Sequence, residues 1–167
     1  GKGRCNITNV AERDEFIRHF ATHAAFVEPV LAQCFNTELM AFFATLGLDL
    51  VTERGGRVFP ASGKATDVVR ALVKWLISSG VHSRCRTRVE ELMLEAGRVI
   101  GVRCGDEVFR ADAVILATGG KSYPATGSTG DGYRLAQTAG HTIVPPRPAL
   151  VPLCTGGRIA PQLDGLA

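Results

Sequence analysis

The chain has 167 residues, of which 46% are hydrophobic and 21% are charged, and its net charge is +3. This balance predicts a soluble globular protein with a core of ordinary single-domain size. No apolar run approaches the roughly 18 residues that span a bilayer, and the N-terminus lacks a signal-peptide pattern. We therefore expect a cytoplasmic protein with no membrane partner.

The positive charge is spread along the chain and concentrates locally only at Arg84, Arg86 and Arg88. Residues that alternate at period two share one face of a strand, and a solvated face is the favoured interpretation of such a run. We therefore assign no nucleic-acid partner.

Cysteine and histidine give little support for a metal or redox centre. The cysteines are odd in number, far apart and without a Cys-x-x-Cys pair, so we expect most of them to be reduced core thiols. His19 and His23 could hold a metal from one helix face, but no third ligand is evident, and a surface pair is favoured. The cysteines are Cys5, Cys34, Cys85, Cys104 and Cys154.

The first half of the chain predicts several helices and one β-hairpin. Asn36 is the expected N-cap of a helix that Gly47 ends, and Gly55 allows the hairpin turn. A later helix carries an apolar stripe at the 3,4 spacing, and Gly80 ends it. The expected helices cover residues 12–20, 29–35, 37–46 and 66–79, and the hairpin strands cover 48–53 and 57–59.

The second half predicts strands and one helix, so the expected class is α/β. A strand over 81–88 leads into a meander over 89–95, 99–104 and 107–110. The run 113–117 is apolar on every side, which is typical of a buried parallel strand. Asp131 is the expected cap of a helix over 131–139, and the proline-rich stretch 142–153 is expected to be extended.

The run 113–133 carries the strongest functional pattern: an apolar strand, a glycine turn, a glycine-rich loop and a helix. Thr118-Gly119-Gly120 alone is equally compatible with a plain α/β turn and with a cofactor site. The longer loop adds Gly127, Gly130 and more hydroxyl groups, which leaves many polar groups without secondary-structure partners. A bound nucleotide-type cofactor would satisfy them.

Three strings occur in a fixed order: Gly3-Arg4-Cys5-Asn6-Ile7-Thr8-Asn9, Gly55-Gly56-Arg57-Val58-Phe59-Pro60, and the run 117–141. Together they resemble the BaiN/YhiN-like flavoproteins. The resemblance implies an FAD-dependent oxidoreductase of the glutathione reductase class, with two dinucleotide-binding domains and an inserted substrate-side domain. It covers nearly the whole chain.

The resemblance also implies where the cofactor lies. In that family the Thr-Gly-Gly turn lies beside the ADP part of FAD, and the Gly-Arg-Cys-Asn loop runs toward the flavin. The Thr-Gly-Asp-Gly element approaches the flavin side, and the backbone around Val89 would meet the adenine. The implied cofactor-binding residues are Gly3, Arg4, Cys5, Asn6, Val89, Ala117, Thr118, Gly119, Gly120, Thr126, Gly127, Gly130, Asp131 and Gly132.

Individual residues of these motifs allow more than one role. Arg4 could donate to phosphate or to reduced flavin, or it could form a structural ion pair. Asn6 could donate and accept at a ring edge. Cys5 has no second cysteine nearby for a redox disulfide, so a packed thiol near the cofactor is preferred.

The sequence departs from the family in lacking two elements. The Gly-x-Gly-x-x-Gly turn that holds the FAD pyrophosphate, and the acidic residue that follows it, are expected before Gly1. The C-terminal flavin-binding segment is expected after Ala167. We therefore interpret the chain as a fragment that binds FAD poorly in isolation. Residues 1–150 would form a partial FAD/NAD(P)-binding, Rossmann-like domain, and 151–167 would begin the inserted domain.

The leading functional hypothesis is that the parent protein uses FAD to move hydride between NADH or NADPH and a small organic substrate. The resemblance to bile-acid-reducing members suggests reduction of an activated C=C bond. No catalytic residue is assigned, although Tyr123, Tyr133 and His141 are candidates for a general acid. A flavin- or nucleotide-binding module without turnover, and a methyltransferase-like nucleotide binder, remain alternatives. The sequence leaves the oligomeric state open.

Overall fold

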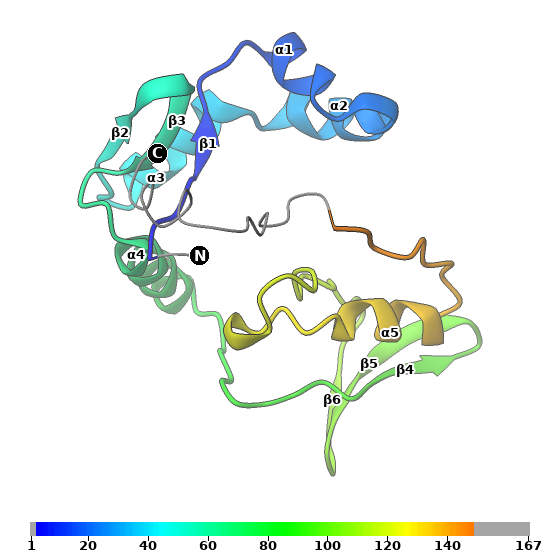
Figure 1. The fold of residues 1–167 in the computed structure, drawn as a ribbon. Coiled ribbons are helices and arrows are strands. Elements are labelled where there is room, and N and C mark those ends of the chain that lie inside the picture. Colours follow the sequence, from blue (N-terminus) through cyan, green and yellow to red (C-terminus); the bar gives the residue numbers. More distant parts are fainter. Residues whose placement is uncertain (1–2, 149–167) are drawn as a thin grey trace, which may run out of the picture. The chain divides into compact units, whose positions relative to one another are not determined.

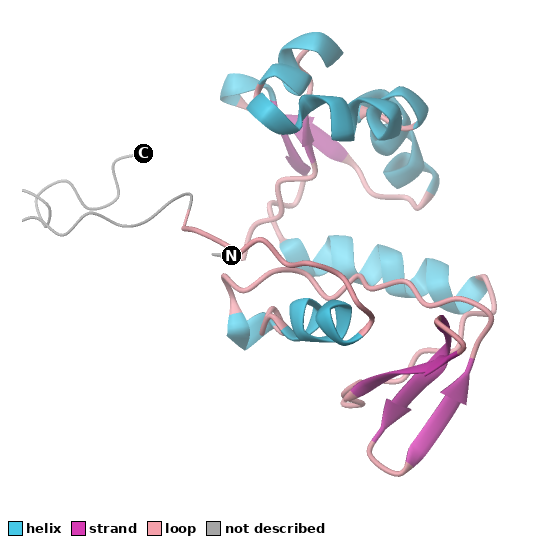
Figure 2. Ribbon diagram, turned by 90° about the vertical axis from the view of Figure 1, so that its right-hand side faces the viewer, coloured by secondary structure: helices cyan, strands magenta, loops and turns pink. Residues whose placement is uncertain are grey.

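A computed structural model describes residues 3–148 of the chain. The chain divides between Thr87 and Arg88 into two compact units, and each is described by itself. Both units combine helices with a three-stranded antiparallel sheet (Figures 1 and 2), so the predicted α/β class is confirmed. The predicted boundary near residue 150 lies at the edge of the described residues and stays a prediction.

The sheet of the first unit contains the predicted hairpin and one strand that the sequence did not reveal. β2 (Leu50–Thr52) and β3 (Arg57–Pro60) are antiparallel and are joined by a 3-10 turn over Arg54–Gly56. The additional strand, β1 (Thr8–Asn9), pairs with the other edge of β3. Because β3 is the central strand, Val58 is fully buried.

Four α-helices accompany this sheet: α1 (Arg13–Arg18), α2 (Ala24–Gln33), α3 (Asn36–Thr45) and α4 (Ala65–Ser78). A short 3-10 turn over Ala21–His23 precedes α2. The spacing of apolar residues predicted a helix over residues 29–35. That start is wrong, since Pro29 lies inside the helix, where it removes one backbone hydrogen bond.

Asn36 is not the N-cap of α3, contrary to the sequence-based expectation. Phe35 holds that position, and its N–H donates to Glu38 Oε2 at 3.0 Å, as in a capping box. The buried Asn36 amide instead donates to the carbonyls of Asn9 at 2.8 Å and Ala11 at 3.1 Å. A tertiary partner therefore recruits the side chain that local sequence assigned to capping.

The helix predicted over 66–79 is confirmed as α4, but its apolar stripe divides into two faces. Val68 is buried in a core with Phe43 and Leu48, and Leu72 packs against that core. Val69 and Ile77 are 59% and 69% exposed. One small core covers only part of the stripe, whose apolar residues are Val68, Val69, Leu72, Val73, Leu76 and Ile77.

The second unit contains the predicted meander. β4 (Glu91–Glu95), β5 (Arg98–Cys104) and β6 (Glu107–Arg110) form an antiparallel sheet in sequence order. α5 (Asp131–Thr138) lies along this sheet in Figure 1, and its Leu135 is almost fully buried. A short 3-10 turn over Pro124–Thr126 precedes α5.

Two predicted strands are wrong within the described residues. Residues 81–88 form no strand, and Arg86 has a φ of 55°, so the three arginines do not share one strand face. Residues 113–117 also form no strand, and Ile115 is 89% exposed. A doubly buried strand needs neighbours on both sides, and no described strand pairs with this run. Residues 142–148 lie outside helices and strands, and the rest of the predicted extended stretch lies beyond the described residues.

The described cysteines are all free, but only some are packed. Cys5 and Cys104 are partly buried, whereas Cys34 and Cys85 are exposed, which corrects the expectation of core thiols for the latter two. Cys154 lies outside the described residues. Among the described residues, no helix is long and apolar enough to cross a membrane.

Candidate cofactor site

Three segments of the second unit meet at the first turn of α5, and we call them together the loop cluster. They are residues 88–90, 118–120 and 126–132. Within the cluster, the Gly130 N–H donates to the Gly120 carbonyl at 3.2 Å. The structure thus brings together the predicted site residues Val89, Thr118, Gly119, Gly120, Thr126, Gly127, Gly130, Asp131 and Gly132. Ala117, exposed and outside any strand, immediately precedes the cluster.

Glycine is required where the segments of the cluster approach each other. Gly119 and Gly130 have φ values of 74° and 86°, a backbone region that side chains disfavour. A Cβ atom on Gly119 would lie 3.0 Å from Ser128 Oγ, and one on Gly132 would overlap Thr118 Oγ1. The glycines therefore allow the Thr-Gly-Gly turn to pack directly against the loop and the helix start.

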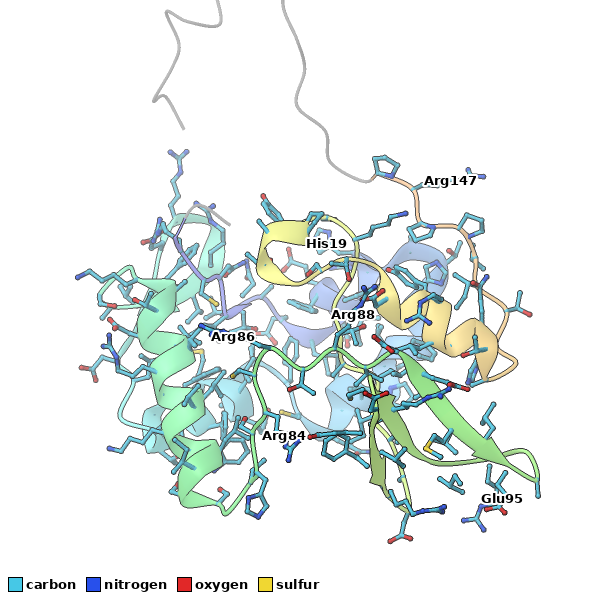
Figure 3. The ribbon with its side chains drawn as sticks, turned by 90° about the horizontal axis from the view of Figure 1, so that it is seen from below. His19, Arg84, Arg86, Arg88, Glu95 and Arg147 are labelled. Carbon is cyan, nitrogen blue, oxygen red and sulfur yellow. The ribbon has the colours of Figure 1, made fainter. Side chains whose placement is uncertain are left out.

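Asp131 is the first residue of α5 and not its cap, which corrects the sequence-based expectation, because Gly130 holds the N-cap position. Its carboxylate accepts two hydrogen bonds from one guanidinium, from Arg88 Nε to Oδ2 at 3.0 Å and from Arg88 Nη2 to Oδ1 at 2.9 Å. This bidentate contact lowers the pKa of Asp131 and raises the pKa of Arg88. Figure 3 shows Arg88 near the start of α5.

The backbone around Val89 is tied to α5 a second time. Arg134, one turn into the helix, donates from Nη1 to the Glu90 carbonyl at 2.8 Å. The Glu90 N–H donates to the Arg103 carbonyl of β5 at 2.9 Å. These two hydrogen bonds fix the segment predicted to meet adenine to both the helix and the sheet. Val89 within it is half-buried.

Hydrogen bonds inside the loop satisfy more of its polar groups than the sequence predicted. The N–H groups of Thr126, Gly127 and Ser128 donate to carbonyls of the preceding turn, and the Thr126 hydroxyl donates to the Tyr123 carbonyl at 2.9 Å. By contrast, the N–H groups of Thr118, Gly119 and Gly120 donate to no other described residue. The donors available to a polar or anionic ligand therefore concentrate at the Thr-Gly-Gly turn.

The Gly-Arg-Cys-Asn string lies in the first unit, where its side chains already have partners. Arg4 forms an ion pair with Glu53, and its guanidinium lies 4.1 Å from the centre of the Phe59 ring. Cys5 packs against the core formed by Phe43, Leu48 and Val68. The structure therefore supports the ion-pair role for Arg4 and the packed-thiol role for Cys5. Whether this string meets a cofactor stays a prediction.

Two of the three strings that carry the resemblance pack on each other. The Gly3 carbonyl accepts a hydrogen bond of 2.8 Å from the N–H of Ala65, the first residue of α4. The Asn9 amide donates to the Gly55 carbonyl at 2.8 Å. A Cβ atom on Gly56 would lie 2.7 Å from Asn9 Oδ1. The Asn6 amide, oriented with its nitrogen toward β3, donates to the Val58 carbonyl at 3.1 Å.

The candidates for a general acid differ in their surroundings. The Tyr133 hydroxyl lies beside Gly120 in the loop cluster, whereas Tyr123 and His141 are exposed. Among the described residues, no group of three His, Cys, Asp or Glu side chains could hold a metal ion. His19 follows α1 and His23 lies in the next 3-10 turn, so the two do not share a helix face.

Sequence reasoning placed the backbone of Arg88-Val89-Glu90 beside the adenine, but it missed the side chains of Arg88 and Arg134 as parts of this site. It assigned Arg88 to a solvated strand face because of its alternation with Arg84 and Arg86. The spacing of Arg134, three residues after Asp131, was an available signal, because an acid and a base at i and i+3 share a helix face. Nothing local links Arg88 to Asp131, which lies 43 residues away.

Comparison with known proteins identifies one family and two similar enzymes. The HI0933-like protein Rossmann domain family matches residues 1–163. The chain is 42% identical, over 92% of its length, to a 3-dehydro-bile acid delta(4,6)-reductase of Clostridium scindens. It is 27% identical, over 91% of its length, to a ribosomal RNA dihydrouridine synthase of Haemophilus influenzae. The chain spans 36% and 38% of the lengths of these two relatives.

Proposed function

We propose, since this chain belongs to the HI0933-like protein Rossmann domain family, that its full-length protein is an FAD-dependent oxidoreductase that reduces an activated C=C bond. NADH or NADPH is the proposed electron donor, and a small organic molecule is the proposed substrate. The observation that carries the proposal is the loop cluster. At the start of α5, its close glycine contacts hold three backbone N–H groups that have no partner among residues 3–148.

The residues of the cluster fit a dinucleotide. The N–H groups of Thr118, Gly119 and Gly120 can donate to phosphate or ribose oxygens, and the absence of Cβ atoms at the two glycines allows a close approach. The N-terminal end of α5 adds the positive end of a helix dipole beside them. The fixed backbone of residues 88–90 offers N–H and C=O groups that an adenine edge can meet.

The chemistry named for the two relatives has a common element. A 3-dehydro-bile acid delta(4,6)-reductase acts on C=C bonds conjugated with a ketone. A dihydrouridine synthase saturates the C=C bond conjugated with a uracil carbonyl. A carbonyl group conjugated with a C=C bond makes one carbon of that bond electrophilic, so such a bond can accept hydride. We infer the same bond type for the substrate of this protein.

FAD, when bound, supplies the hydride transfer, so the protein contributes binding, orientation and electrostatics. The loop cluster would hold the cofactor. Gly119 and Gly120 have no side chains, so the cofactor can lie directly against their backbone. Tyr133, beside Gly120, is the candidate closest to this surface for holding a proton at its hydroxyl.

A second candidate follows from the relative that acts on RNA. The same bond type in a uridine base would make RNA the substrate. We rank a small molecule first because identity to the bile acid reductase is higher over a similar share of the chain. A flavin-binding module without turnover is the third possibility, and it predicts bound flavin that no nicotinamide reduces.

The test is the visible absorption spectrum of the purified full-length protein before and after anaerobic NADH or NADPH. Flavin bands that a nicotinamide bleaches support the oxidoreductase. An α,β-unsaturated ketone and a uridine-containing RNA are then added separately to the reduced protein. Reoxidation by the ketone alone supports the proposed substrate class, and reoxidation by RNA alone supports the second candidate. A protein that cannot be reconstituted with FAD contradicts the proposal.

A further inference from the structure

The contact between Arg88 and Asp131 joins the two segments that the proposed site needs most. Arg88 begins the segment that contains Val89, and Asp131 lies at the start of α5, within the glycine-rich loop. Two parallel hydrogen bonds of 2.9 Å and 3.0 Å fix both the distance and the angle between the side chains. A bidentate arginine–carboxylate pair gives such geometric definition, which a single lysine contact does not.

The surrounding contacts connect this pair to each segment of the loop cluster. Arg134 contacts the same carboxylate at 4.0 Å and also donates to the Glu90 carbonyl. The Thr129 side chain, from the loop side, also lowers the pKa of Asp131. Asp131 therefore contacts the loop, its own helix and the segment 88–90 with a single side chain. The side chain of Asp131 is 24% exposed and that of Arg88 is 69% exposed, so solvent screens the charge attraction and the value of the contact lies in its bidentate geometry.

We propose that Arg88 is a positioning residue for the dinucleotide, acting through Asp131 to hold the backbone of residues 88–90 in register with the Thr-Gly-Gly turn. This inference rests on the proposed function. The sequence assigned only the backbone of Arg88 to the cofactor, and its guanidinium is bonded to Asp131. It therefore acts on the ligand through the backbone and not by direct contact.

The test measures FAD dissociation constants for four forms of the full-length protein: wild type, Arg88→Gln, Asp131→Asn and the double variant. Loss of the bidentate contact should weaken FAD binding by about tenfold in Arg88→Gln. Because Arg88 acts through Asp131, the Arg88→Gln change should have no further effect in the Asp131→Asn background. Arg88→Lys keeps the charge without the fork and should recover binding only in part.

A matched control is the Arg70–Asp67 pair on α4, which is an exposed arginine–aspartate contact of 2.8 Å in the other unit. Arg70→Gln should leave FAD binding within twofold of wild type. Thermal unfolding without FAD and the visible circular dichroism of the bound flavin are recorded for each variant. A positioning role changes the flavin signal and the dissociation constant, whereas a purely structural role changes the melting temperature alone.

The outcomes separate the two proposals. If the wild type binds FAD and Arg88→Gln binds equally well, the positioning role is overturned and the proposed function stands. If Arg88→Gln weakens binding as strongly in the Asp131→Asn background, Arg88 contacts the ligand directly and the role is also overturned. If Arg88→Gln does not fold, Arg88→Lys decides by the same criterion. A wild type that does not bind FAD overturns both proposals.

Discussion

The Gly-Gly pairs at 55–56 and 119–120, which both lie within the described residues, show how differently one motif can be used. At Gly55–Gly56 the polar groups have partners within the first unit: the Gly55 carbonyl accepts from Asn9, the Gly56 carbonyl accepts from the Val10 N–H, and the Gly56 N–H donates to the Glu53 carbonyl. At Gly119–Gly120 only the Gly120 carbonyl has a described partner, Gly130. The first pair closes a hairpin, whereas the second presents backbone donors. The neighbours of a glycine pair therefore decide its role.

The largest effect expected is on the sheet that supports the second glycine pair. Gly101 in β5 has a φ of 151°, and a Cβ atom there would overlap the Phe109 carbonyl and lie 3.0 Å from Arg110 Cα. Gly101→Ala should therefore lower the free energy of unfolding by about 3 kcal/mol or more, because backbone atoms cannot move aside easily. Urea denaturation of the full-length protein measures the change.

Gly97→Ala is the matched control for this substitution. Gly97 also has a positive φ, 78°, but a Cβ atom there would meet nothing within 4 Å. Only the backbone strain remains, so the loss should be about 1 kcal/mol. Equal losses at the two positions would contradict the close packing of β5 against β6.

The next effect tests the sheet around the first glycine pair. Val58 is fully buried in β3, and Val58→Ala should lower the free energy of unfolding by about 2 kcal/mol through lost apolar contact. Val69→Ala removes the same atoms from the exposed face of α4 and should change the free energy of unfolding by less than about 0.5 kcal/mol. Urea denaturation followed by Trp75 fluorescence compares the two. A similar loss at Val69 would show that another part of the full-length protein covers that face.

A smaller effect sharpens the contrast between the two glycine turns. Asn9→Ala removes the donor to the Gly55 carbonyl and the acceptor of the Ala11 N–H. The free energy of unfolding should fall by about 1 kcal/mol, with FAD affinity unchanged. A change in FAD affinity without a change in stability would place the first glycine pair in the binding site, against the present interpretation.

The smallest effect expected is on the stability of the protein in acid. Arg88 holds the pKa of Asp131 below its ordinary value, so the unfolded chain takes up a proton at that carboxyl before the folded protein does. The stabilisation is complete above the ordinary aspartate pKa of about 4 and is lost as pH falls through the lowered value. Unfolding measured between neutral pH and about pH 2.5 should therefore show a weaker acid dependence in Asp131→Asn. An unchanged dependence would contradict the ion pair.

The sequence by itself determined much of the local structure. The meander, the hairpin and α4 follow from alternation, turn glycines and 3,4 spacing, which depend on neighbours within a few residues. The Thr118–Gly132 motif and the family resemblance followed from residue identity alone. The sequence also located the glycine turn whose backbone donors are available, although it overestimated how many groups of the longer loop lack partners.

The tertiary structure decided which hydrogen-bond partner each polar side chain has. Asn36 and Asp131 both have the chemistry of an N-cap, but Asn36 donates to the carbonyls of Asn9 and Ala11, and Asp131 accepts from Arg88. The run 113–117 has the composition of a buried strand, but a strand requires partner backbone, and no described strand supplies it. Pairings between residues far apart in sequence depend on chain closure and packing, which no local pattern records.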